Sequence, residues 1–197
     1  MVLTRGFDRL VNLSDAVIAI AVTLLILPLV DAAGDIGTPS PAQFLADNAE
    51  QLFLFVLSFV VIANFWLVHH KLYRAIDGYT IALVWANFLW LLTIVFLPFP
   101  TELLGQSSRS DSVVVALYIA TMVLNTYAGC IQQWIIVRKP ELQLEGSRGS
   151  VRLSAALVPA ALMTVALVLA LVVPGLGLWA LLVLLPSGLI TKWVARG

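Results

Sequence analysis

Long apolar stretches, separated by short breaks, dominate this sequence of 197 residues. A transmembrane α-helix needs about 20 mostly apolar residues, because roughly 30 Å of hydrocarbon is crossed at a rise of about 1.5 Å per residue. The stretches are continuously apolar and do not alternate with polar residues, so helices are favoured over a transmembrane β-barrel. Six stretches meet the length requirement, and the last is the shortest: 12–30, 51–70, 79–98, 113–137, 153–173 and 177–194.

The composition indicates that lipid surrounds these stretches. Hydrophobic residues make up 61% of the chain and charged residues 11%, which is more apolar surface than one soluble domain of this length can bury. The first stretch lacks a cleavage motif of small residues and carries Asp15 near its start, so we interpret it as a retained helix and not a signal peptide. We therefore expect one domain over 1–197, an all-α integral membrane protein with six transmembrane helices. The predicted helix breaks fall at Gly34, Gly37, Pro39, Pro41, Pro98, Pro100, Pro140 and Pro174.

The basic residues predict the orientation in the membrane. Short loops rich in Lys and Arg stay on the cytoplasmic side. If the six helices span, Arg109 alone falls on the opposite side, and both termini are cytoplasmic, which requires an even number of spans. The basic residues assigned to the cytoplasmic side are Arg5, Arg9, Lys71, Arg74, Arg138, Lys139, Arg148, Arg152, Lys192 and Arg196.

Several classes of function are excluded by absent patterns. The formal net charge is zero and no basic stripe is interleaved with aromatic residues, so nucleic acid is not an expected partner. Catalytic, zinc, Walker and dinucleotide motifs are missing, and Asp15 is the only carboxylate inside an apolar span, so we expect no enzyme. A single cysteine, Cys130, allows neither a disulfide nor a Cys-based zinc site within one chain. The Thr-Val-Gly-Tyr-Gly filter of potassium channels is also absent, so side chains would have to form the constriction of a channel.

The first apolar stretch has two different faces. On a helical wheel, four of its residues share a sector of about 100°, whereas Asp15 lies about 140° from Ile20. The shared face either packs against a neighbouring helix, with Thr23 bonded to a carbonyl one turn earlier, or lines a permeation pathway. Spacing alone does not decide between the two. The stripe consists of Ile20, Thr23, Leu24 and Leu27.

Asp15 needs a partner, because an unpaired carboxylate in hydrocarbon is costly. One interpretation pairs it within the subunit with Arg9 or a histidine. The second stretch ends with His69 and His70, which form a weak metal site because neighbours on a helix point about 100° apart. They are also plausible pH sensors. We prefer to place His69 as a hydrogen-bond partner of Asp15 and Ser14.

Amides inside a span usually bridge helices. Asn87 lies in the third apolar stretch between Trp85 and Trp90, and Asn125 lies in the fourth. We predict that Asn87 joins the network around Asp15 and that Asn125 serves packing.

These residues resemble a known family. Arg9-x-x-x-Leu13-Ser14-Asp15 resembles the Arg-x-x-x-Phe-Ser-Asp signature of the transmembrane protein 175 family, with Leu13 in place of phenylalanine. Segments 65–73 and 86–100 resemble the family's second and third helices in order and spacing. The likeness covers about residues 9–105. Eukaryotic members are endosomal and lysosomal potassium channels and bacterial members carry one six-helix unit, so the chain is identified as a bacterial member, expected to be multi-pass in the plasma membrane.

The resemblance implies a homotetramer in which helix one of each subunit lines a central pore. By position, Ile20 corresponds to the narrowest hydrophobic ring, Leu24 and Leu27 to rings further out, and Thr23 to a hydroxyl ring associated with potassium preference. The expected function is passive, potassium-selective permeation through a hydrophobic gate, with K⁺ as the permeant ion, no cofactor, and the lipid bilayer and other copies of the chain as partners. The residues expected to brace helix one from behind are Arg9, Ser14, Asp15, His69 and Asn87.

Two other functions stay open at this point. A proton-linked secondary transporter would relay protons through Asp15 and His69. The sequence shows no paired half-repeat and no evident broken helix in mid-span, which counts against it. A non-conducting membrane assembly protein is the other alternative.

Overall fold

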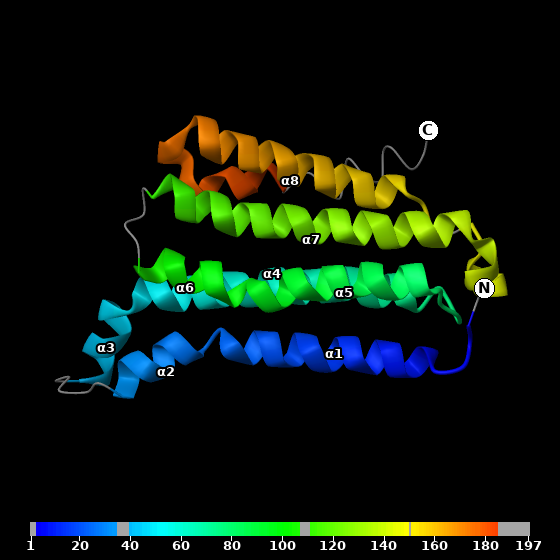
Figure 1. The fold of residues 1–197 in the computed structure, drawn as a ribbon. Helices are drawn as coiled ribbons and strands as arrows, with labels where there is room; N and C mark the ends of the chain where they lie inside the picture. The colour runs from blue at the N-terminus through cyan, green and yellow to red at the C-terminus, as the bar shows by residue number, and fades with distance from the viewer. Residues whose placement is uncertain (1–2, 35–39, 107–110, 150, 185–197) are drawn as a thin grey trace.

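The computed structural model describes residues 3–34, 40–106, 111–149 and 151–184. Within these ranges the regular structure is helical, with two isolated β-bridges between loops (Figure 1). The α-helices are α1 (Phe7–Leu24), α2 (Leu27–Gly34), α3 (Pro41–Asp47), α4 (Ala49–Tyr73), α5 (Ile81–Phe96), α6 (Pro98–Gln106), α7 (Ser112–Arg138) and α8 (Ser154–Val172). The 3-10 helices are η1 (Pro140–Leu142), η2 (Glu145–Ser147) and η3 (Pro174–Leu184).

Four helical stretches of the described chain are long and apolar enough to cross a membrane: Phe7–Gly34, Ala49–Tyr73, Ile81–Gln106 and Ser112–Arg138. They coincide with the first four predicted spans, so the prediction of an all-helical membrane protein is confirmed. The fifth predicted span, 153–173, coincides with α8, whose apolar part Ala156–Val172 is shorter. The sixth, 177–194, is described only as far as Leu184, and 185–194 lie outside the described residues. The count of six spans stays a prediction.

Two of the four spans are interrupted. Helix α1 ends at Leu24 and α2 begins at Leu27, a break that the sequence analysis did not predict. The other break falls between Phe96 and Pro98, where we expected the prolines to end the span. Helix α6 instead begins at Pro98, because a proline in the first turn of a helix needs no N–H donor. The third span therefore continues to Gln106.

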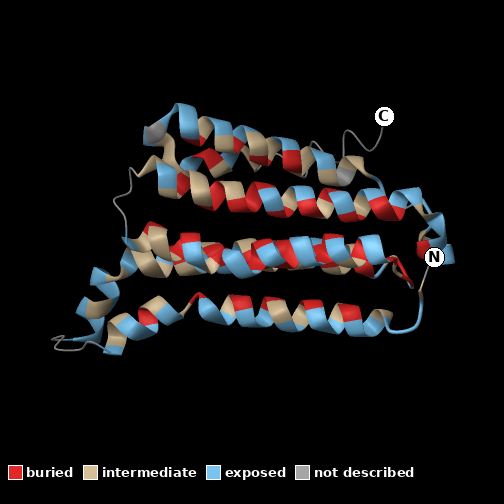
Figure 2. Ribbon diagram, in the orientation of Figure 1, coloured by how far each residue is buried: buried red, intermediate tan, exposed pale blue. Residues whose placement is uncertain are grey.

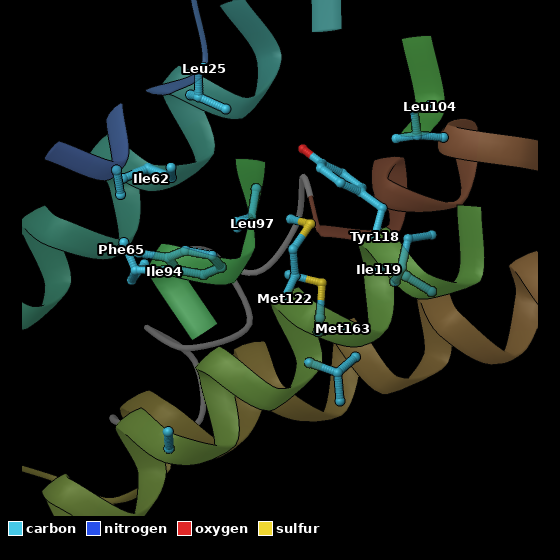
Figure 3. Close-up of a cluster of buried hydrophobic side chains, with 14 of the residues drawn as sticks. Leu25, Ile62, Phe65, Ile94, Leu97, Leu104, Tyr118, Ile119, Met122 and Met163 are labelled. Carbon is cyan, nitrogen blue, oxygen red and sulfur yellow. The ribbon is translucent and has the colours of Figure 1, made fainter. Parts of the chain in front are cut away.

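The helices lie side by side, with α1 at one edge of the bundle, α8 at the opposite edge, and α4, α5 and α7 between them (Figure 1). Buried residues follow the inward faces of these helices (Figure 2). Their core packs Ile62, Ile94 and Leu97 against Tyr118 and Ile119, all fully buried (Figure 3). Helix α8 adds buried small side chains at Ala160, Ala166 and Ala170, which let it approach α7 closely.

A loop layer, formed by residues 3–6, 74–80 and 139–149, closes the end of the bundle where the chain begins. Leu3 and Tyr79 exchange two backbone hydrogen bonds of 2.8 Å, and the amide of Leu144 donates to the carbonyl of Ala75 at 3.0 Å. Phe7 stacks on Tyr73 and Tyr79, with ring centroids 6.0 and 6.5 Å apart. The start of α1 is therefore attached to the loop 74–80 and to the end of α4.

The loop layer also gathers the basic residues that predicted the orientation. Arg5 and Arg74 lie within it, as do Lys139 and Arg148, and Lys71 and Arg138 lie in the helix ends next to it. Three of the eleven, Arg109, Lys192 and Arg196, lie outside the described residues. The gathering supports one Lys- and Arg-rich side, and its assignment to the cytoplasm stays a prediction.

Gly6 precedes α1 in a left-handed conformation, with φ +90°, and a Cβ there would meet only the Tyr79 hydroxyl at 3.8 Å. We expect Gly6→Ala to lower the free energy of unfolding by about 1–2 kcal/mol through backbone strain and not through a clash. Thermal unfolding in detergent, followed by circular dichroism, measures the change. Gly146→Ala is the control, because its φ is not in this region and nothing lies within 4 Å of the added Cβ. Equal stability of the two variants would contradict the left-handed conformation of Gly6.

Candidate functional site

Helix α1 and the start of α2 present an outward stripe. Ile20 is 60% exposed, Leu24 39% and Leu27 48%, and Thr23 is also exposed. Their spacing of three and four residues places them on one face. The opposite face is buried and consists of Leu10, Ser14, Ile18, Ala21 and Leu25. The structure thus turns all four residues of the predicted stripe away from their own subunit.

The hydroxyl of Thr23 has its hydrogen committed within the helix. Its Oγ1 donates to the carbonyl of Ile20 at 2.8 Å. Because a hydroxyl has one hydrogen and two acceptor lone pairs, the outward side of this group can only accept. An exposed oxygen of this kind suits a cation better than an anion.

The inner face of α1 is held by a chain of hydrogen bonds. Asn87 Nδ2 donates to Ser14 Oγ at 2.8 Å, and Ser14 Oγ donates to the carbonyl of Leu10 at 2.9 Å. The amide oxygen of Asn87 accepts from His69 Nε2 at 2.8 Å. Ser14 and Asn87 have no exposed surface, and His69 is buried. The structure therefore brings together three of the five residues predicted to brace helix one.

Aromatic rings fix the imidazole of His69. It stacks between Tyr73 and Trp90, with centroid distances of 4.1 and 4.3 Å and interplanar angles near 20°. His70 takes a different place and stacks on Trp66 at 5.0 Å. We preferred His69 to His70 as a partner of Asp15 and Ser14, and in the structure His69 is bonded to Asn87 instead, which in turn is bonded to Ser14.

The other two predicted members lie elsewhere. Asp15 Oδ1 accepts from the indole nitrogen of Trp66 at 2.8 Å, and this bond takes the place of the expected pairing of Asp15 with Arg9 or a histidine. The Arg9 side chain is exposed and makes no hydrogen bond within the described part of the chain. The physical reason is that Trp66 precedes His69 by about one turn of α4, so its neutral donor reaches the side of α1 that carries Asp15.

Sequence reasoning missed a second buried chain of hydroxyl groups. Ser58 Oγ lies 2.9 Å from Thr101 Oγ1 and 3.1 Å from the Tyr118 hydroxyl, and Thr101 donates to the carbonyl of Leu97. Since each hydroxyl has one hydrogen, Tyr118 donates to Ser58 and Ser58 to Thr101. The residue types were a weak signal, because buried serine and threonine usually bond back to their own helix.

Asn125, which we assigned to packing, bridges two helices. Its Nδ2 donates to Thr93 Oγ1 at 2.7 Å and so connects α7 to α5. It has no hydrogen bond to the Ser14, Asn87 and His69 chain in the described structure. Its place is therefore apart from the face of α1.

These features define an all-helical integral membrane protein whose first helix is held on one face by buried polar side chains and is exposed on the other. Residues 9–98 match the family model described as endosomal/lysosomal potassium channel TMEM175. The chain belongs to the TMEM175 family.

Curated relatives agree with this family. A protein of Streptomyces collinus named as a potassium channel is 33% identical over 68% of this chain and 66% of its own length. A protein of a Chryseobacterium species, also named as a potassium channel, is 28% identical over 69% of this chain and 67% of its own length. The chicken protein named endosomal/lysosomal proton channel TMEM175 is 25% identical over 68% of this chain and 26% of its own length. The aligned part of this chain thus spans about two thirds of the bacterial relatives and a quarter of the vertebrate one.

Solved structures show the same fold. The potassium channel MtTMEM175 superposes with a TM-score of 0.70 at 14% identity, over 95% of this chain and 91% of that one. A lysosomal potassium-selective channel TMEM175 homolog from Chamaesiphon minutus superposes with a TM-score of 0.59 at 23% identity, over 92% of this chain and 98% of that one. The family and these relatives are ion channels and not enzymes, as the sequence predicted.

Replacing Asn87 by leucine should destabilise the protein, because it leaves His69 Nε2 and Ser14 Oγ buried with a partner removed. We expect a loss of about 2 kcal/mol or more, the size of an unmade buried hydrogen bond or two. Thermal unfolding in detergent measures it. Asn12→Leu, at an exposed amide on α1, is the control and should change little. Equal losses would show that the Asn87 bonds carry no stability.

The contact of Asp15 with Trp66 should appear as energetic coupling. In a double-mutant cycle, Asp15→Asn and Trp66→Phe should deviate from additivity by about 0.5–1.5 kcal/mol, the range found for polar pairs between membrane helices. Chemical or thermal unfolding of the four proteins gives this value. Trp85→Phe, at an indole that is 69% exposed, should combine additively with Asp15→Asn. Additivity in both cycles would refute the contact.

Proposed function

We propose that this chain is one subunit of a potassium-selective channel of the bacterial plasma membrane, in which four copies assemble around their first helices. The observation that carries the proposal is the outward stripe of α1 and α2, which an isolated subunit leaves uncovered. The description of the Streptomyces and Chryseobacterium relatives as potassium channels supports potassium as the permeant ion.

The position of α1 in the bundle favours assembly around it. One helix cannot enclose a path, so several copies are needed, and four suffice. Because α1 lies at the edge of the bundle, it can reach a symmetry axis without another helix of its subunit in between (Figure 1). A helix in the middle of the bundle, such as α5, could not do this.

The stripe has the chemistry of a hydrophobic gate. Ile20 and Leu24 lie about 6 Å apart along α1, at a rise of about 1.5 Å per residue, and Leu27 follows at the start of α2. Rings of Ile20 and Leu24 exclude water when they are close together, so the closed barrier is the free energy of dehydrating K⁺ in an apolar constriction. When the rings part, Thr23 oxygens can replace part of the hydration shell. Opening therefore requires α1 to rotate or to tilt.

The bonds on the inner face of α1 would set its rotation. Ser14 is bonded to Asn87, and Asp15 is bonded to Trp66, so α1 is tied to both α5 and α4. Rotation of α1 stretches or breaks these two contacts. We propose that Ser14, Asp15, His69 and Asn87 act in gating and assembly, with Arg9 at the membrane surface, and not in ion selection.

The rival transporter would pass protons between Asp15 and His69. In the structure Asp15 is bonded to Trp66 and His69 to Asn87, so no direct hydrogen bond between them supports a relay. Planar-bilayer recording of purified protein separates the two functions. Single-channel conductance steps support the channel, whereas saturable flux coupled to a pH gradient supports the transporter, and absence of flux supports an assembly protein.

Ile20→Asn tests the pore directly. If Ile20 rings form the constriction, a polar side chain there wets the path, so K⁺ flux into liposomes should rise about tenfold and the preference for K⁺ over Na⁺ should fall, the lowered dehydration barrier being of the order of 1.4 kcal/mol. Leu92→Asn is the matched control, because Leu92 is similarly exposed, at 64%, but lies on α5. Unchanged flux in Ile20→Asn, or the same rise in both variants, would remove Ile20 from the pore.

A further inference from the structure

The outward stripe of α1 and α2 continues past Leu27 to a charged residue. Asp31 follows Leu27 by four residues in α2, so the two side chains lie about 40° apart around the helix axis. Both residues are exposed. Leu29, the buried residue of α2, lies about 160° from Asp31, on the opposite face. Asp31 therefore faces away from its own subunit on the same side as the stripe.

The position of Asp31 is unfavourable for α2 itself. Asp31 begins the last turn of this helix, and the C-terminal end of a helix carries a partial negative charge. No Lys or Arg lies in that turn to offset it. The Asp31 carboxylate also has no hydrogen bond or ion pair within the described part of the chain. A cation from solution would offset both the carboxylate and the helix end.

The charges around Asp31 have the same sign. The Lys and Arg residues that the structure describes lie in the loop layer or beside it, at the other end of the bundle (Figure 1). Arg109 belongs to residues that are not described. Asp31 differs from the other carboxylates at its end in lying on α2, in register with the stripe. The described carboxylates at this end are Asp31, Asp47, Glu50, Glu102 and Asp111.

From this register and charge we infer that Asp31 forms a ring of carboxylates at the mouth of the assembled pore, where it concentrates K⁺ next to the constriction. Leu27 and Asp31 lie about 6 Å apart along α2, so the ring stands about one turn beyond the last apolar ring. The inference rests on the proposed channel function, because one subunit contributes one carboxylate and the ring needs the other copies.

A carboxylate ring of this kind acts through its electrostatic potential. The potential attracts K⁺ and Na⁺ alike, because it depends on the charge of the ion. We therefore assign to Asp31 the rate at which cations enter from its side, and not the preference for K⁺ over Na⁺. Salt screens the potential, since the Debye length falls from about 10 Å at 0.1 M to about 3 Å at 1 M.

A tightly bound metal ion is a different interpretation, and one subunit does not support it. In the described part of the chain, no group of three or more His, Cys, Asp or Glu side chains is placed to hold a metal. Asp31 is thus assigned to attracting ions that pass through.

The experiment is planar-bilayer recording of the purified protein in symmetric KCl at about 0.1 M and about 1 M. In Asp31→Asn we expect the single-channel conductance to fall about twofold or more at the lower concentration and to change little at the higher one, with an unchanged permeability ratio of K⁺ to Na⁺. Asp47→Asn is the matched control, at an exposed carboxylate on α3 at the same end, and should change the conductance little at either concentration.

Asp31→Cys provides a second variant, in which a chosen charge is attached from the side away from the loop layer. A methanethiosulfonate reagent that adds a sulfonate should raise the conductance of Asp31→Cys at the lower KCl concentration, and one that adds a trimethylammonium should lower it. The wild-type chain is the control for the reagents, because its single cysteine, Cys130, is buried.

Any of four results would overturn the inference while the wild-type chain still conducts. They are an unchanged conductance of Asp31→Asn at the lower concentration, an equal loss in Asp47→Asn, a changed permeability ratio in Asp31→Asn, or the same response of Asp31→Cys to both reagents. If Asp31→Asn does not fold, the response of Asp31→Cys decides. A wild-type chain without conductance would refute the channel and, with it, the ring.

Discussion

The hydrogen bond from Asn87 to Ser14 determines which face of α1 meets its own subunit. Both groups are buried, and each of their bonds has a specific partner. A rotation of α1 by one residue, about 100°, would withdraw Ser14 from Asn87 and leave both polar groups unpaired in hydrocarbon. The outward position of Ile20 is thus a consequence of the bonds on the opposite side of the helix.

Two buried polar chains connect the bundle in the same way. One runs from His69 through Asn87 and Ser14 to a carbonyl of α1, and the other from Tyr118 through Ser58 to Thr101 and the carbonyl of Leu97, between α5 and α6. Each joins three helices, and α4 contributes to both. Lipid offers no hydrogen bonds, so polar side chains inside a span have to satisfy one another. This requirement specifies how neighbouring helices are aligned along their length.

Periodicity was sufficient to predict the first four spans and the shared face of the residues from Ile20 to Leu27, because each depends on spacing within one helix. The polar residues Ser14, His69 and Asn87 were predicted to lie in one network because polar residues are rare in an apolar span, but the bond between Ser14 and Asn87 was not predicted. The pairing of Asp15 with Trp66 was missed because tryptophan at a membrane interface is common and does not by itself indicate a partner. The continuation of the third span past Pro98 was missed because proline both ends helices and begins them. The chain of hydroxyls around Ser58 depends on tertiary packing, which one sequence does not encode as a local pattern.

The loop layer holds α1 at its start but not at its other end. Near its start, Leu3 pairs with the loop at Tyr79, and Phe7 stacks on two tyrosines, whereas its other end passes into α2 through a break after Leu24. A helix that is held at one end and broken at the other moves most at the broken end. Displacement of α1 is therefore expected to grow with distance from its start. Residues beyond Leu24 then move most, and the residues beside Ser14 act as the pivot.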